Sequence, residues 1–179
     1  MANPRIGPGT RSDVGWVNWL VAVISGRATG TSPPNLFLTM GRHRRLFRGW
    51  LRFAGRLMPR GTLPRRETEL VILRVAHLRA CEYEFEHHAR LGRRAGLRDE
   101  DLESVTRPLA EGSWTDRQRT ILSAVDRLSS DRNLDDDTWT ELRQHLDERA
   151  CIELLMLVGH YEMLATFIET VGVPMDAVR

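Results

Sequence analysis

Side chains that can exchange protons are concentrated in the middle of this chain, where Glu69, Cys81, Tyr83, Glu84, His87 and His88 fall within twenty positions. They flank an apolar run, residues 70–75, that must be buried in a folded protein. Burial beside charged neighbours moves pKa values toward working pH, so such a group is what a partly desolvated reaction site requires. A solvated polar helix face is the simpler interpretation, and both remain open at this point.

A helix over residues 81–90 would place Cys81, Glu84 and His88 on one face, because positions three and four apart are neighbours. Near the start of that helix, Cys81 would experience the N-terminal dipole, which favours the thiolate. Three nearby carboxylates, of Glu82, Glu84 and Glu86, act against this. The alternative is that Cys81 is a small buried apolar residue, the commoner role of a helical cysteine.

Glu69 begins the apolar run and must therefore find a partner or have its pKa raised. An ion pair with Arg65 or Arg66, one turn earlier, would provide that partner. Arg74 or Arg79 could bind a substrate carboxylate through two parallel hydrogen bonds, although either could equally be structural.

The spacing of Glu84 and His88 also suits a helical metal pair, with His87 nearby. No second motif supplies the remaining ligands, so we predict no metal site. His87 remains a candidate for substrate binding.

Two segments of the chain echo each other: residues 69–77 and 153–160 each begin with glutamate, continue with four apolar residues and end with histidine. Either a helical unit was duplicated or two apolar helices are similar by chance. The echo adds His160 to the candidates for substrate binding.

The elements that position these residues are all expected to be helical. At 179 residues and 41% hydrophobic content, the chain suits a single domain with its own core. We expect an arm and a short helix in residues 1–33, with a loop from residue 26 to 34, and a helical domain over 34–179. Within them, apolar periodicity and capping residues predict helices near residues 13–24, 35–40, 43–58, from 65, 81–95, 99–107, 116–129, 137–146 and 148–171. No segment combines period-two alternation with turn signals, so the fold class is all-α, with a helical hairpin at its centre.

Charge is divided unevenly along the chain: residues 1–98 hold 18 Arg and 6 acids (+12), and residues 99–179 hold 8 Arg and 18 acids (−10). Complementarity between halves or between subunits explains this more simply than nucleic acid or membrane binding, and we predict neither of those partners. An arginine at every fourth position from Arg44 to Arg56 similarly indicates a solvated or inter-subunit face. All 26 basic residues are Arg, which excludes chemistry that needs a catalytic lysine.

The two cysteines, Cys81 and Cys151, are too few for a disulfide scaffold and indicate a reducing, cytoplasmic location. The early apolar stretch, residues 14–24, lacks the pattern of a signal peptide and is too short to span a membrane.

The central stretch GTLPRRETELVILRVAHLRACEYEFEHHARLGRRAGL resembles the core of carboxymuconolactone decarboxylase-like proteins, the superfamily that includes alkylhydroperoxidase D. The resemblance extends on both sides, from Pro34 to Pro174. It implies an alkylhydroperoxidase D-like helical bundle that assembles into a homo-oligomer (dimer, trimer or hexamer) and acts on a small-molecule substrate without a cofactor.

The resemblance also implies roles for residues. Glu69, Cys81, Tyr83 and His88 match active-site positions of the hydroperoxidase branch, whereas Glu84 stands where that branch has its second cysteine. No Cys-x-x-Cys disulfide can form here, so the two-thiol peroxide cycle is not expected.

Three functional hypotheses follow. The first is proton-transfer or decarboxylation chemistry on a carboxylated or lactone substrate, in which Glu84 and His88 exchange protons and Glu69 positions the imidazole. The second is thiol-dependent hydroperoxide reduction by Cys81, with Glu69 and His88 as a proton relay. The third is a non-catalytic oligomeric binding protein.

Overall fold

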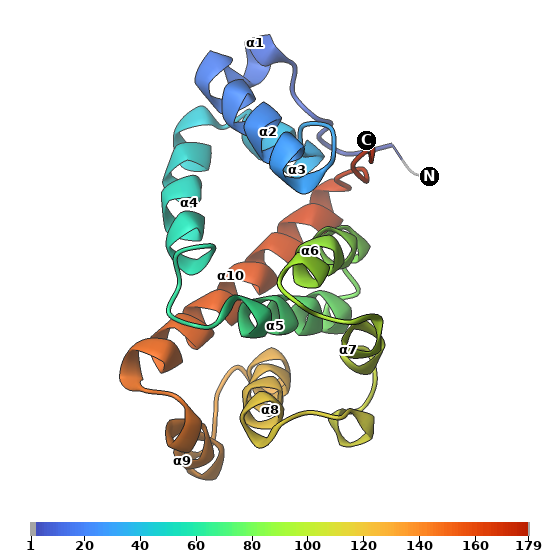
Figure 1. Cartoon of the computed structure of the whole chain (residues 1–179). Coiled ribbons are helices and arrows are strands. Elements are labelled where there is room, and N and C mark those ends of the chain that lie inside the picture. The colour runs from blue at the N-terminus through green and yellow to red at the C-terminus, as the bar shows by residue number, and fades with distance from the viewer. Residues whose placement is uncertain (1–2, 179) are drawn as a thin grey trace. The chain divides into compact units, whose positions relative to one another are not determined.

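The computed structural model describes residues 3–178, which are helical except for connecting segments and one isolated bridge between Thr31 and Val178 (Figure 1). No strand occurs in this part of the chain, and the predicted all-α class is confirmed. The helices are α1 (Arg11–Val14), α2 (Trp16–Thr29), α3 (Asn35–Met40), α4 (Arg44–Leu57), α5 (Arg65–Leu78), α6 (Glu82–Arg94), α7 (Asp99–Ser104), the 3-10 turn η1 (Leu109–Glu111), α8 (Asp116–Asp131), α9 (Asp136–His145) and α10 (Glu148–Val171).

The chain divides into two compact units, and each is described by itself. The hairpin unit is Leu57–Ala165, and the basic unit comprises residues 3–56 with 166–178. The hairpin unit holds 16 Arg and 21 acids, a net charge of −5, whereas the described basic unit holds 9 Arg and 3 acids, a net charge of +6. The two units thus differ in the sign of their charge, although their boundaries are not the division at residue 98 found along the sequence.

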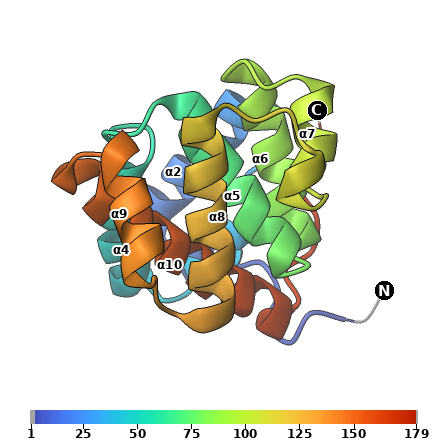
Figure 2. The same ribbon diagram turned by 90° about the horizontal axis from the view of Figure 1, so that it is seen from below.

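The hairpin unit is built around α5, which packs against both α6 and α8 (Figure 2). The side chains from Thr68 to Ala76 are all buried, because the apolar run covers every side of the helix. Around it lies a core cluster of Leu70, Leu73, Ala89, Leu97, Leu102, Val105, Trp114 and Leu122. Burial of α5 on all sides forces its polar residues to find partners inside the protein.

Helix ends in the hairpin unit follow the capping signals closely. Thr115 and Gln118 form a capping box at the start of α8, which begins at Asp116 as the capping residues predicted. The cap of α9 is Asp135, whose carboxylate accepts from the amide of Thr138, so this helix begins at Asp136, one position before the expected start at residue 137. A run of three aspartates offers three possible caps, and sequence spacing alone does not choose among them.

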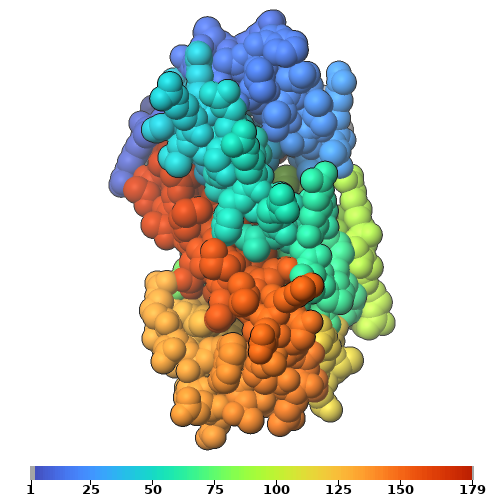
Figure 3. Space-filling view, turned by 90° about the vertical axis from the view of Figure 1, so that its left-hand side faces the viewer, coloured from blue at the N-terminus to red at the C-terminus, as the bar shows by residue number. Residues whose placement is uncertain are grey.

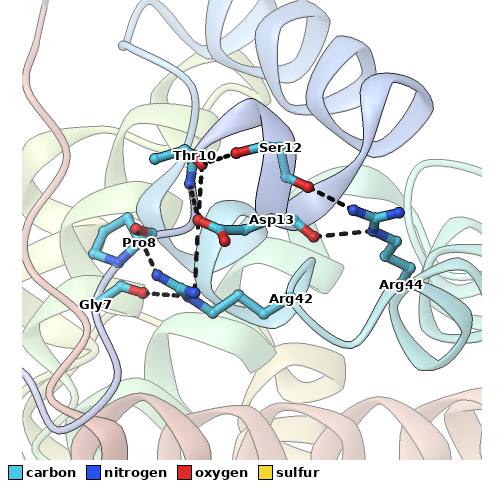
Figure 4. A network of polar contacts seen from close by, with 7 residues as sticks. All are labelled: Gly7, Pro8, Thr10, Ser12, Asp13, Arg42 and Arg44. Carbon is cyan, nitrogen blue, oxygen red and sulfur yellow. Dashed lines mark hydrogen bonds and ion pairs between the residues drawn. The ribbon is translucent and has the colours of Figure 1, made fainter.

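In the basic unit the N-terminal segment is more ordered than the predicted arm and short helix. Gly15, with φ +81°, separates α1 from α2, and α2 continues to Thr29 through part of the expected loop. Arginine side chains hold this segment: Arg42 Nε donates to the carbonyl of Gly7 and Arg44 Nε to that of Asp13, each at 2.9 Å (Figure 4). These contacts cannot be foreseen from local sequence, because they join residues more than thirty positions apart.

Helix α10 has the length and apolar composition that could cross a membrane, the one such helix among the described residues. A buried core helix meets the same criterion, and 56% of its most apolar window is buried in the protein. Within the hairpin unit, Leu154, Leu157, Val158 and Leu164 are among its core residues.

Candidate active site

The centre of the candidate site is a buried pair formed by Glu69 and His88. His88 Nδ1 lies 2.8 Å from Glu69 Oε2, and the exposed fractions of the two residues are 5% and 0%. Because a carboxylate oxygen accepts, the proton of the neutral imidazole is assigned to Nδ1, which makes Nε2 the basic nitrogen. The other carboxylate oxygen, Oε1, forms an ion pair with Arg65, one turn earlier on α5. The hairpin of α5 and α6 brings the pair together.

Tyr161, from α10, completes this cluster. Its ring stands perpendicular to that of His88, at 89° with centroids 5.0 Å apart, and its hydroxyl contacts Met58 Sδ at 3.8 Å. Burial raises the pKa of Tyr161 well above its usual value, and the charges of Glu69 and Glu84 raise it further. Tyr161 therefore stays neutral, with both carboxylates near it.

The predicted residue Glu84 is buried on α6, with an exposed fraction of 3%, four positions before His88. Tyr83 is also buried. Glu69 and Glu84 are both near enough to Tyr161 to raise its pKa, and the Tyr161 ring contacts His88, so these residues surround one buried tyrosine.

Two more histidines border the pair, as the sequence suggested. His87 and His88 have ring centroids 5.4 Å apart, and His160 contacts Tyr161 at 5.1 Å. Burial lowers the pKa of His87 to about 3 and that of His160 to about 4, with the nearby His88 acting in the same direction. Both imidazoles are therefore neutral at physiological pH.

Cys81 stands at the start of α6. It is the N-cap residue of α6, almost fully buried, and it lines a pocket of about 360 Å³ together with Ala76, His77, Ala80, Glu82, Phe85 and Thr106. Burial lowers the pKa of His77, and Arg74 lowers it further. As the N-cap residue, Cys81 has extended rather than helical backbone and directly precedes the helix that carries Glu84 and His88.

The two arginines proposed for substrate binding are engaged by the protein itself. Arg74 makes two hydrogen bonds to Asp126 of α8, both 2.7 Å, and donates to the carbonyls of Val105 and Arg107. Arg79 donates to Glu162 and to the carbonyl of Ser129. Their donors therefore join helices to one another. Of the two roles left open by the sequence, substrate binding or a structural contact, both arginines have the structural one.

Sequence reasoning missed Tyr161 as part of the site. Its neighbour His160 was selected through the internal echo, but a buried tyrosine on an apolar helix carries no local signal. Arg65 was named only as a possible partner of Glu69, and the i, i+4 spacing was the signal that found it.

No group of three or more His, Cys, Asp or Glu side chains among residues 3–178 is arranged to hold a metal ion.

Residues 44–127 match a sequence model of the carboxymuconolactone decarboxylase family. This segment runs from α4 into α8 and includes Glu69, Cys81, Glu84 and His88. Over this segment the chain is similar to the carboxymuconolactone decarboxylase family, as its central stretch indicated.

Solved structures share the fold at low sequence identity. An uncharacterized peroxidase-related protein from Ralstonia eutropha JMP134, with an alkylhydroperoxidase AhpD core, has a TM-score of 0.83 at 17% identity, covering 97% of this chain and 94% of that one. An uncharacterized peroxidase-related protein from Silicibacter sp. TM1040 has a TM-score of 0.84 at 15% identity, covering 98% of this chain and 95% of that one. The debrominase Bmp8, in complex with 2,3,4-tribromopyrrole, has a TM-score of 0.82 at 18% identity, covering 97% of this chain and 92% of that one. The alkylhydroperoxidase D-like fold is thereby confirmed. A search of curated proteins finds no match.

Proposed function

We propose that this protein is an enzyme that moves protons on a small carboxylated or lactone substrate, with His88 as the base and acid, Glu84 as its exchange partner, and Glu69 as the residue that orients the imidazole. The observation that carries this proposal is the buried contact between His88 Nδ1 and Glu69 Oε2. A carboxylate that fixes the tautomer leaves Nε2 able to take or give a proton in a defined direction.

The shielding of this pair also favours proton transfer. Glu69 is fully buried, and Arg65 balances its charge from the far oxygen. A charge held in a low-dielectric interior acts more strongly on a neighbouring imidazole than it would in water. An imidazolium at His88 would therefore be stabilised by Glu69 while it holds the proton that is exchanged with the substrate.

This arrangement suits a decarboxylation in which His88 supplies the proton that replaces CO₂. The bond between the substrate carbon and its carboxylate breaks, CO₂ leaves, and the electron pair stays on the carbon as an enolate. Protonated His88 then gives one proton to that carbon, and Glu84 or solvent returns a proton to His88. The reaction consumes one proton for each CO₂ released.

The test compares matched variants on a panel of carboxylated γ-lactones, followed by CO₂ release and by exchange of solvent deuterium into the carbon acid. His88→Gln and Glu84→Gln should each lower turnover by about 10²-fold or more, the usual share of a general acid or base. Cys81→Ser should keep most of it, and His145→Gln, on α9, serves as the control for a distant histidine. Full activity in His88→Gln would refute the proposal.

A second candidate function, hydroperoxide reduction by Cys81, is favoured by the pocket that this residue lines. Structural neighbours named as peroxidase-related proteins support it, as does the debrominase, whose bound complex carries a cysteine-to-alanine change. The thiol would take one oxygen from the peroxide to give a sulfenic acid and an alcohol. Two external thiols would then restore Cys81, releasing a disulfide and water.

This candidate predicts that a dimedone adduct forms at Cys81 after treatment with cumene hydroperoxide, and that Cys81→Ser removes both the adduct and peroxidase turnover. Cys151→Ser, at the other buried cysteine, is the matched control and should change neither. If Cys81→Ser still consumed peroxide, hydroperoxide reduction by Cys81 would be contradicted. The proposal of proton transfer by His88 would be unaffected.

A further inference from the structure

The guanidinium of Arg65 uses one of its nitrogens on Glu69 and has another without a partner. Its Nη2 atom forms the ion pair with Glu69 Oε1, whereas Nη1 is buried and has no hydrogen-bond partner in the described chain. A buried polar group without a partner is rare in proteins, because it has lost its hydration without compensation. This donor is therefore able to bind a group that the protein itself does not supply.

The unpartnered donor belongs to the candidate active site. Arg65 is the first residue of α5, one turn before the Glu69 that contacts His88. It is also close to Tyr161: burial and the charges of Glu69 and Glu84 raise the pKa of that phenol, and the charge of Arg65 acts in the opposite direction. Arg65 thus adds a fixed positive charge to the residues around the buried tyrosine.

The start of α5 lies at the surface of the hairpin unit. The segment that leads into it, in blue-green, lies beside the first turns of α10, in orange (Figure 3), and the amide of Leu63 donates to Glu153 Oε1 at 2.9 Å between them. The side chain of Arg65 is 34% exposed, whereas that of Glu69 is fully buried. A small molecule that enters from solvent can therefore reach the guanidinium of Arg65 before it reaches the carboxylate.

Of the other arginines on α5 and α6, one more has a buried donor without a hydrogen-bond partner in the described chain, Nε of Arg90. Arg90 lies near His87: burial lowers the pKa of that imidazole, and the charges of His88 and Arg90 lower it further. Arg66, by contrast, pairs with Asp101 at 2.9 Å. Arg90 is therefore the rival that an experiment has to exclude, and Arg66 supplies a control.

We propose that Arg65 Nη1 donates a hydrogen bond to a carbonyl oxygen of the substrate and stabilises the negative charge that this oxygen gains during decarboxylation. The inference rests on the proposed function and adds to it the residue that stabilises the enolate. A cation held beside the oxygen before the reaction stabilises the enolate more than the substrate, and this difference accelerates the step.

The electrons and protons of this step balance. When the bond between the substrate carbon and its carboxylate breaks, CO₂ leaves and the electron pair is shared between that carbon and the adjacent carbonyl oxygen. Arg65 keeps all its protons, because a guanidinium is not deprotonated in proteins. The proton that the carbon receives comes from His88, and the carbonyl double bond then forms again.

This role of Arg65 selects a class of substrate. An arginine bound to the departing carboxylate would oppose the reaction, because that group loses its charge as CO₂ forms and the substrate would be stabilised more than the transition state. A donor beside the carbonyl has the opposite effect. The substrate class is therefore an acid whose carboxylate is attached to the carbon next to a carbonyl, as in a lactone carboxylated beside its ring carbonyl.

The test measures the binding of two probes by isothermal titration calorimetry. Tetronate is the enolate anion of a five-membered lactone, and γ-butyrolactone is an uncharged lactone of the same ring size. The wild-type protein should bind tetronate more tightly than γ-butyrolactone. Arg65→Gln should weaken tetronate binding by about 10-fold to 100-fold, the usual contribution of a hydrogen bond to a charged group, and should change γ-butyrolactone binding much less. Arg65→Lys should recover part of the loss.

Two single variants serve as controls. Arg66→Gln removes the same charge one position along α5, from a side chain of nearly equal exposure, 33%, and should leave tetronate binding unchanged. Arg90→Gln should leave it unchanged as well. If Arg90→Gln abolished tetronate binding and Arg65→Gln did not, the inference would be wrong.

A double variant separates enolate binding from charge balance within the ion pair. Arg65→Gln alone leaves Glu69 with an uncompensated buried charge and should destabilise the protein. Arg65→Gln with Glu69→Gln removes both charges, so stability in urea unfolding should recover while tetronate binding stays weak. Recovery of tetronate binding in the double variant would show that Arg65 only neutralises Glu69, and would overturn the inference.

Failure of this inference can be distinguished from failure of the proposed function, which the turnover of His88→Gln decides. Lost turnover in His88→Gln, together with wild-type tetronate affinity in Arg65→Gln, would reject the role of Arg65 and keep proton transfer by His88. A wild-type protein that binds tetronate no more tightly than γ-butyrolactone would also reject the role of Arg65.

Discussion

At the scale of single residues, the candidate site depends on how burial distributes charge. Glu69 keeps its place in the core because Arg65 and His88 engage both of its oxygens. Burial lowers the pKa of both His87 and His160, so these two imidazoles beside His88 are held neutral. The imidazole of His88 is thus paired with a carboxylate between two neutral imidazoles.

The depressed pKa values of His87 and His160 predict a loss of stability in mild acid. Between the unfolded pKa of 6.5 and the folded values of about 3 and about 4, the unfolded chain binds more protons, so stability rises with pH. Lowering the pH from 7.5 to 5 should cost on the order of 1–2 kcal/mol for each histidine. Urea unfolding across this range measures it.

Replacing both residues, as His87→Asn with His160→Asn, should flatten this pH dependence. An unchanged slope in the double variant would show that other groups cause it.

At the scale of elements, close backbone contacts decide which glycines can be replaced. A Cβ at Gly26 of α2 would lie 2.4 Å from the carbonyl oxygen of Ser32, whereas one at Gly49 of α4 would meet nothing within 4 Å. Gly26→Ala should therefore destabilise the protein by roughly 1–3 kcal/mol. Gly49→Ala should stabilise it by about 0.4–1 kcal/mol, because alanine has less conformational freedom to lose. Thermal unfolding of the two variants gives opposite shifts, and shifts of the same sign would contradict this explanation.

The contact between α5 and α8 depends on Arg74. Replacing it by methionine removes four hydrogen bonds and leaves Asp126 without its partner, so Arg74→Met should cost about 3–5 kcal/mol. Arg127→Met removes an exposed pair with Asp131 on α8 and should cost less than about 1 kcal/mol. Chemical denaturation compares them, and equal costs would mean that Arg74 is not the link between these helices.

At the scale of the whole molecule, contacts distant in sequence join its segments. Glu153 of α10 accepts from the backbone amides of Thr62 and Leu63, about ninety positions earlier, just before α5 begins. Glu153→Gln removes the charge that strengthens both bonds and should destabilise the hairpin unit by roughly 1–3 kcal/mol. Glu148→Gln, exposed at the start of the same helix, is the matched control in denaturant unfolding. A cost no larger than that of the control would contradict this role.

Much of this protein follows from local sequence. The all-α class, the bounds of α10, the capping box of α8 and the hairpin of α5 and α6 were predictable, because helix periodicity and capping depend on neighbours within a few positions. The proximity of Glu69 and His88 was anticipated only through the family resemblance. The polar residues of the central stretch could be recognised as candidates because they border an apolar run that must be buried.

Tertiary structure decided which candidates meet. Tyr161 contacts His88 at the site, Arg74 and Arg79 form ion pairs with residues of α8 and α10, and Cys81 lines a pocket at the N-cap of α6. These outcomes depend on contacts between segments up to ninety positions apart, where the packing of whole helices, rather than spacing along one of them, determines which side chains touch. The sequence by itself determined the helices and the residues able to do chemistry, and the fold selected the buried Glu69–His88 pair from among them.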